Sequence, residues 1–99
     1  MDKEQVIEVV RQYKDAIINQ ISDAKVYLYG SYSKGTAGPD SDIDVAVVVP
    51  ALNDDWLDVS AILWLIAPQI NYLIEPVLID QRFPSPLYDD VMSTGIAIA

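Results

Sequence analysis

The chain has 99 residues, of which 52% are hydrophobic and 21% are charged, and its formal net charge at pH 7 is −9. This composition excludes intrinsic disorder, and the length predicts one small domain over residues 1–99. Because the sequence lacks cysteine and histidine, it excludes thiol chemistry and leaves oxygen ligands, which suit hard cations such as Mg²⁺. The acidic charge would repel a polynucleotide, so we expect no direct nucleic-acid partner.

The N-terminal segment lacks the pattern of a signal peptide, and no apolar run approaches the roughly 18 residues that span a bilayer. We therefore expect a cytoplasmic protein that does not associate with a membrane. Apolar residues instead recur at spacings of three and four between Asp2 and Ile21, which predicts an amphipathic helix. Asp2 and Gln5 have the spacing of a capping box at its start.

Two expected strands flank a polar loop. Lys25–Tyr29 alternates well enough to predict a strand that ends at Gly30. The short polar segment Ser31–Gly35 then begins a helical turn, whose free N–H groups and dipole favour a phosphate. Asp42–Val49 predicts a second strand that is apolar on both faces beyond Asp44, and we therefore expect it to be central in its sheet.

A second long helix is expected from Trp56 to Ile66, with caps offered by Asn53–Asp55 and with Pro68 as its limit. Every position from Ile62 to Ile66 is apolar, which exceeds what one core-facing stripe requires. Two interpretations remain open. The surplus apolar surface, at Trp64 or Leu65, faces a partner, or the helix is sandwiched within the core.

The last third of the chain predicts one more strand and one more helix. Leu73–Asp80 is apolar apart from Glu75, and Pro76 requires an edge position or one that donates no ladder bond. Ser85 and Pro86 begin a helix that ends at Gly95, and the apolar tail after it predicts a short terminal strand. This order of elements predicts an α/β fold, a small sandwich in which helices pack on a mixed β-sheet.

Asp42 and Asp44 are the residues that point most directly to chemistry. They lie two apart at the start of a strand, so their side chains leave the same face. Two parallel carboxylates so close repel each other unless a cation lies between them. Together with Gly30-Ser31 upstream, they are the residue types that move a phosphoryl or nucleotidyl group. The alternative is a solvated strand start after a turn, although a turn does not require the Gly-Ser pair.

Gly30-Ser31, ten residues, and then Asp42-Ile43-Asp44 resembles the signature of the polymerase-β-like nucleotidyltransferase superfamily. The compact length resembles its minimal nucleotidyltransferase (MNT) family, and Lys34 and Gly35 also fit that family's pattern. The resemblance implies transfer of a nucleoside monophosphate from ATP or another NTP, with pyrophosphate leaving. It further implies two Mg²⁺ ions held by Asp42, Asp44 and a third carboxylate on a neighbouring strand, with Gly30, Ser31 and Lys34 at the phosphates.

The third carboxylate that the resemblance implies is either Glu75 or Asp80. Glu75 lies early in its strand, as Asp42 and Asp44 do in theirs, and a Glu in so apolar a strand is costly to bury without a cation or a donor. Asp80 lies five residues further on, hence on the opposite strand face, and has the position of a loop cap. We therefore expect Glu75 in the metal site, as a longer side chain than the Asp that the family more often has there.

MNT proteins resembling this chain are paired with a HEPN-family protein in toxin–antitoxin modules, where the MNT member can nucleotidylate a tyrosine of the toxin. The resemblance therefore implies an antitoxin that transfers AMP from ATP to a HEPN partner, within a hetero-oligomer. Two alternatives remain open. One is a non-catalytic module that neutralises or scaffolds a partner by contact alone, and the other is a small-molecule transferase that needs a second chain to complete its acceptor pocket.

Overall fold

The structure, a computed structural model, describes all residues from 1 to 99. Four strands form one sheet in the order β3-β2-β1-β4, in which β2 and β3 are parallel and β1 is antiparallel to both of its neighbours. This arrangement confirms the predicted mixed sheet and small α/β sandwich. The elements in chain order are α1 (Lys3–Ile17), β1 (Lys25–Tyr29), α2 (Ser31–Lys34), β2 (Ile43–Val49), α3 (Trp56–Ile70), β3 (Ile74–Asp80), α4 (Pro86–Thr94) and β4 (Ile96–Ile98).

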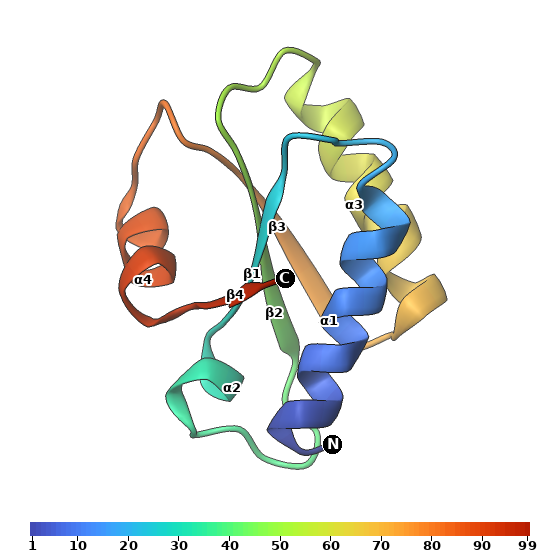
Figure 1. The fold of residues 1–99 in the computed structure, drawn as a ribbon, viewed down its shortest axis with the longest axis vertical. Coiled ribbons are helices and arrows are strands. Elements are labelled where there is room, and N and C mark those ends of the chain that lie inside the picture. Colours follow the sequence, from blue (N-terminus) through green and yellow to red (C-terminus); the bar gives the residue numbers. More distant parts are fainter.

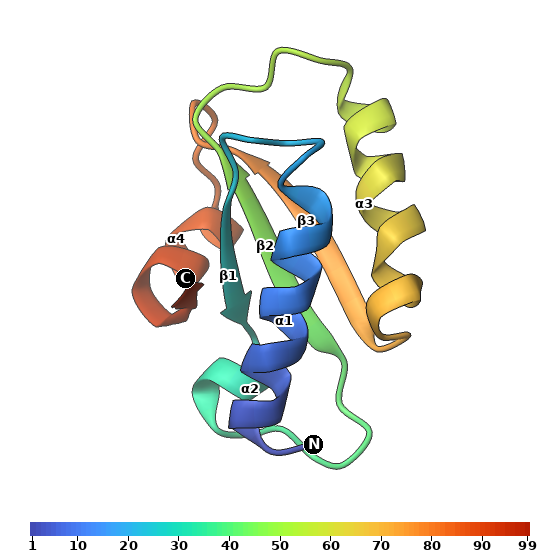
Figure 2. The same ribbon diagram turned by 45° about the vertical axis from the view of Figure 1, so that its right-hand side comes forward.

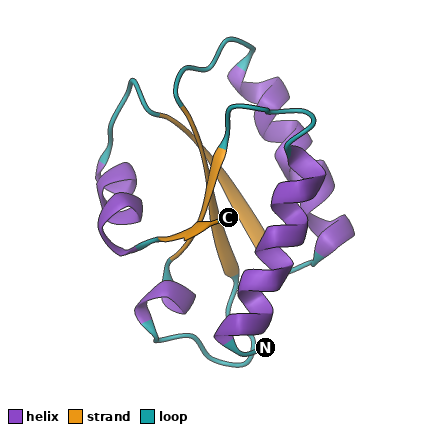
Figure 3. Cartoon of the chain, in the orientation of Figure 1, coloured by secondary structure: helices purple, strands orange, loops and turns teal.

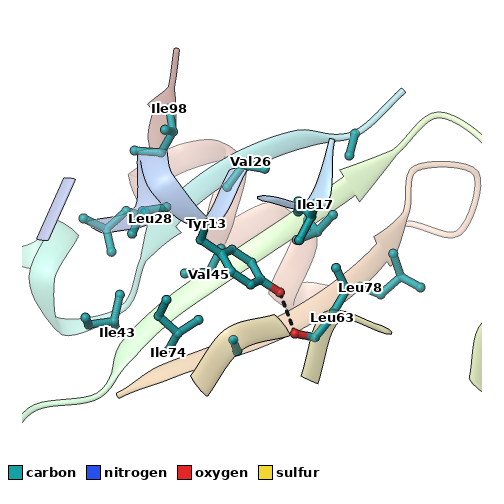
Figure 4. Close-up of a cluster of buried hydrophobic side chains, with 14 of the residues drawn as sticks. Tyr13, Ile17, Val26, Leu28, Ile43, Val45, Leu63, Ile74, Leu78 and Ile98 are labelled. Atoms are coloured by element: carbon teal, nitrogen blue, oxygen red, sulfur yellow. Dashed lines mark hydrogen bonds between the residues drawn. The ribbon is translucent and has the colours of Figure 1, made fainter. Parts of the chain in front are cut away.

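Helices cover both faces of the sheet, with α1 and α3 on one face and α4 on the other (Figures 1 and 2). The larger core lies between the sheet and the α1–α3 pair, and Figure 4 shows its side chains. Within it, the hydroxyl of Tyr13 donates a hydrogen bond of 2.9 Å to the backbone oxygen of Leu63, which joins α1 to α3. A smaller apolar cluster lies under α4 and includes Val48, Ile79 and Val91.

The start of α1 has the predicted capping box. Asp2 accepts from the backbone N–H of Gln5 at 2.8 Å, and the Gln5 side chain accepts from the N–H of Asp2 at 2.9 Å. The helix ends at Ile17, one turn before the predicted end at Ile21. Ile21 nevertheless packs against the core from the following turn, which explains why its apolar spacing continued the helical pattern.

Helix α3 continues to Ile70, so the prediction that Pro68 limits it is wrong. Pro68 is exposed, and the hydrogen bond it cannot make would have gone to the backbone oxygen of Trp64, another exposed residue, where water can replace it. Ala67 is buried and Ile70 packs against the core, and these contacts keep the last turn helical. Trp64 and Leu65 are 53% and 67% exposed, so the sandwiched-helix alternative is wrong for both.

The C-terminal half otherwise follows the predicted pattern. β3 is an edge strand, as Pro76 requires, and the Ser85 side chain caps α4 by accepting from Tyr88 N at 3.2 Å. The chain then turns at Gly95 and pairs β4 with the free side of β1. Figure 3 shows the same arrangement with helices, strands and loops distinguished by colour. None of the helices is long and apolar enough to span a membrane.

Candidate active site

Gly30 joins β1 to α2 in a backbone conformation, φ 72° and ψ −144°, that side chains rarely permit. The short helix α2 then begins at Ser31, and its first turn closes through Lys34 N, which donates to the Gly30 oxygen at 3.1 Å. A Cβ at position 30 would overlap with Oδ2 of Asp44. The bare backbone of Gly30 therefore lets the Gly-Ser turn lie directly against a carboxylate of the neighbouring strand.

One row of the sheet brings together residues of three strands at its α2 end. Asp44 of β2 pairs in register with Tyr29 of β1 on one side and with Glu75 of β3 on the other. Asp42 directly precedes β2, two positions before Asp44, and side chains two apart leave the same face of a strand. Since β2 and β3 are parallel, both strands begin at this end of the sheet, and all three acidic residues gather there.

The three carboxylates repel one another. The pKa of Asp44 is raised by its partial burial and by the charge of Asp42. The pKa of Glu75 is raised chiefly by the charge of Asp42, with further contributions from burial, from Asp44 and from a hydrogen bond with Asp42. No group of three acidic side chains converges closely enough to surround a metal ion in this structure. The arrangement is thus an acidic end of the sheet in which the charge of Asp42 makes the carboxyl groups of Asp44 and Glu75 harder to ionise.

Glu75 is exposed, so the cost of burying a Glu in so apolar a strand does not arise. It lies at the start of an edge strand, where the side chain of a long residue reaches solvent. Asp80 lies at the other end of β3 and is buried, with only 8% of its surface exposed. Its carboxylate accepts from the Arg82 side chain at 2.7 Å and from Leu52 N at 3.1 Å. Asp80 therefore joins two loops away from the acidic end, as predicted for a loop cap.

Lys34 lies at the end of α2, and its Nζ atom is 3.3 Å from Oδ2 of Asp90 on α4. Asp90 also contributes to the raised pKa of Tyr29, after burial and the charges of Asp44 and Glu75. The sequence leaves open whether Tyr29 packs in the core or stacks on a nucleobase, and it gives no indication of Asp90. Tyr29 fits a core strand, and nothing in the pattern of α4 indicates that it crosses the sheet to reach the Gly-Ser turn.

Residues 4–96 match the family model described as a nucleotidyltransferase domain, and the chain belongs to this family of nucleotidyltransferase enzymes. Among named proteins it is 25% identical over 99 residues to MJ0141 of Methanocaldococcus jannaschii, a candidate protein adenylyltransferase, covering 95% of this chain and 99% of MJ0141.

Solved structures agree on the fold. A candidate nucleotidyltransferase from Sulfolobus solfataricus superposes with a TM-score of 0.69 at 12% identity, over 96% of this chain and 80% of that protein. A toxin–antitoxin structure with AMP-PNP superposes with a TM-score of 0.62 at 24% identity, over all of this chain and 73% of that one. A mutant of the toxin–antitoxin pair MntA-HpeT has a TM-score of 0.59 at 25% identity, with 72% of that chain covered.

Proposed function

We propose that this protein is a Mg²⁺-dependent nucleotidyltransferase that transfers AMP from ATP to a tyrosine hydroxyl of a HEPN-family partner, acting as the antitoxin of a toxin–antitoxin pair. The observation that carries the proposal is the position of Asp44, which lies against Gly30 and opposite Glu75. This places the Gly-Ser turn and the carboxylates on one end of the sheet. The likeness to a candidate protein adenylyltransferase and to toxin–antitoxin structures supports the choice of a protein acceptor.

The donor set fits magnesium. Asp42, Asp44 and Glu75 offer only carboxylate oxygens, which hard cations prefer. The charge of Asp42 raises the pKa values of Asp44 and Glu75, so ionising these two beside it is unfavourable, and a divalent cation would offset that cost. We assign the two proposed Mg²⁺ ions to these three side chains. When bound, the ions would stabilise negative charge on the attacking and leaving oxygens of the transferred phosphoryl group.

The Gly-Ser turn is the proposed binding site of the triphosphate. The missing side chain of Gly30 leaves its backbone open to close approach, and the Ser31 hydroxyl adds a donor at the start of α2. Lys34 adds a positive charge at the end of the same turn. Asp90 pairs with that charge in this structure, so binding a phosphate at Lys34 requires this exposed ion pair to open. Such a pair is worth little, and a triphosphate would displace Asp90 at low cost.

Intact-mass spectrometry tests the proposed transfer. The chain is incubated with ATP, Mg²⁺ and the partner protein that co-purifies with it. The partner is expected to gain one or more AMP units, and peptide mapping is expected to place them on tyrosine. Asp42→Asn and Asp44→Asn are expected to abolish the gain. Asp40→Asn, an exposed aspartate in the same loop, is the matched control and should preserve it. A stable complex with no mass gain from any of the four NTPs would instead indicate neutralisation by contact.

A further inference from the structure

Tyr72 is the one tyrosine that the fold leaves exposed. The chain has six tyrosines, and the other five are buried or partly buried: Tyr13, Tyr27, Tyr29, Tyr32 and Tyr88. Tyr72 keeps 83% of its surface in solvent. Its ring therefore adds little to the core, and its hydroxyl is accessible to another molecule.

Tyr72 lies in the turn between α3 and β3, and hydrogen bonds on both sides of it hold this turn. The side-chain oxygen of Asn71 accepts from Leu73 N at 2.9 Å. The backbone oxygen of Asn71 accepts from Ile74 N at 3.2 Å. Leu73 packs against the larger core. The turn is therefore fixed in place while it leaves the Tyr72 side chain in solvent.

This turn lies beside the acidic end of the sheet. The residue after Tyr72, Leu73, accepts from Ile43 N at 2.8 Å, and Ile43 lies between Asp42 and Asp44. Adjacent strands are about 4.8 Å apart, a distance that an aromatic side chain spans. Figures 1 and 2 show the α3–β3 turn and α2 at the same end of the sheet. The hydroxyl of Tyr72 is thus within reach of the carboxylates of β2.

The strand order places Tyr72 and the proposed phosphate site on opposite sides of β2. Gly30 follows β1, on one side of β2, and Tyr72 precedes β3, on the other. In an in-line displacement at phosphorus the attacking and leaving oxygens lie on opposite sides. If pyrophosphate leaves from the Gly-Ser turn, the attacking hydroxyl arrives from the β3 side. Tyr29 pairs with Asp44 but lies on β1, beside the leaving pyrophosphate, so it is the less suitable acceptor.

We propose that the chain, in the absence of its protein partner, transfers AMP from ATP to its own Tyr72, an inference that rests on the proposed function. A bond forms between the Tyr72 hydroxyl oxygen and the α-phosphorus, and the bond from that phosphorus to the oxygen bridging to the β-phosphate breaks. Pyrophosphate leaves, and the phenolic proton passes to solvent. Because Tyr72 and the partner's tyrosine approach from the same side, a bound partner suppresses self-modification.

Intact-mass spectrometry of the chain alone, incubated with ATP and Mg²⁺, tests self-modification. The chain is expected to gain one AMP unit, and peptide mapping is expected to place it on Tyr72. Tyr72→Phe should abolish this gain while it retains the wild-type Tm and the transfer of AMP to the co-purifying partner. Tyr88→Phe, at a partly buried tyrosine on α4, is the matched control and should gain AMP as the wild type does. An excess of the partner is expected to slow the modification of Tyr72.

A mixture of two variants tests whether the transfer occurs within one chain. Isotopically heavy Asp44→Asn is mixed with light Tyr72→Phe, and neither should gain AMP, because the acceptor and the intact site are on different molecules. AMP on the heavy chain, or on a tyrosine other than Tyr72 in the wild type, overturns the proposal. A partner that gains AMP while the chain alone gains none overturns self-modification and leaves the proposed function intact. If neither protein gains AMP, both proposals fail.

Discussion

Oδ2 of Asp44 occupies the space that a Cβ on Gly30 would need, so the aspartate side chain lies directly against the glycine. Gly30 also has a positive φ of 72°. Two separate constraints therefore require glycine at this position. The contact fixes the distance between the Gly-Ser turn and the carboxylate of Asp44. The proposed reaction depends on this distance.

Gly30→Ala tests this contact. The backbone strain alone costs about 1–3 kcal/mol, and the overlap with Asp44 must also displace the turn or the carboxylate. We expect a lowered Tm and loss of nucleotidyl transfer, measured by thermal denaturation and intact mass. Gly35→Ala is the matched control, since Gly35 also has a positive φ, 76°, but has open space where a Cβ would lie. It should cost about 1–2 kcal/mol and retain transfer. Equal losses of activity in both variants would contradict the account.

Asp44→Asn is expected to raise stability at neutral pH while abolishing transfer. The pKa of Asp44 is raised in the folded state by burial and by Asp42. A raised carboxyl pKa favours the folded state below the unfolded pKa, and this advantage is lost as pH rises through the folded pKa. At neutral pH the ionised Asp44 is thus destabilising, and the amide removes that cost. Urea denaturation at pH 7 measures the difference.

Adding Mg²⁺ should make the wild-type chain more stable than Asp44→Asn, which reverses their order without the metal. In the wild-type chain, Mg²⁺ at 100 times its dissociation constant would stabilise the folded state by about 2.7 kcal/mol, whereas Asp44→Asn should gain much less. The shift of Tm on adding Mg²⁺ measures this, with Asp40→Asn as the control expected to respond like the wild type. Equal Mg²⁺ responses in all three proteins would place the metal elsewhere.

Lys34→Ala is expected to raise the KM for ATP by about tenfold, because a charged contact to phosphate contributes roughly 1.4 kcal/mol or more. Removing the charge of Asp90, which competes with phosphate for Lys34, should have the opposite effect on the KM. Asp90→Asn frees Lys34 from an exposed ion pair and should leave the KM unchanged or lower it. Steady-state kinetics of pyrophosphate release measures both variants. A higher KM in Asp90→Asn would show that Asp90 supports nucleotide binding.

Asp80→Asn is expected to reduce the loss of stability in acid. The pKa of Asp80 is lowered mainly by the hydrogen bond from Arg82, against the effect of burial. A lowered carboxyl pKa stabilises the folded state above the unfolded pKa, about 3.9 for Asp, and that contribution is lost as pH falls through the folded pKa. Urea midpoints at pH 7 and pH 3 measure the effect. If the two proteins lose stability equally between these pH values, the Asp80–Arg82 pair is not formed in solution.

Local chemistry predicted the helix starts because caps act within a few residues. Asp2 and Gln5 determine the start of α1, and Ser85 determines the start of α4, without help from distant parts of the chain. The helix ends were harder to predict. A proline ordinarily signals the end of a helix. The prediction was wrong for Pro68 because its ring and the carbonyl that it leaves free are both on the exposed side of α3.

The candidate site was predictable where residues are close in sequence. Strand alternation places Asp42 and Asp44 on one face, and the antiparallel pairing of the consecutive strands β1 and β2 brings the Gly-Ser pair beside Asp44. Glu75 was predicted as a site residue from its place in the expected strand. Its exposure could not be predicted, because it depends on β3 being at an edge without a helix over its start. Asp90 reaches Lys34 only because α4 returns across the sheet, which no local pattern encodes.

The proposed reaction requires nucleotide and metal to bind at the α2 end of the sheet. NMR line broadening by Mn²⁺ with ATP, used in place of Mg²⁺, tests it most directly because the paramagnetic effect falls steeply with distance. We expect strong broadening of the amide signals of Gly30, Asp44 and Glu75, with sharp signals at Asp80 and Leu52 at the opposite end, and no selective broadening in Asp44→Asn. Broadening centred on Asp80, or unchanged in the variant, would contradict it.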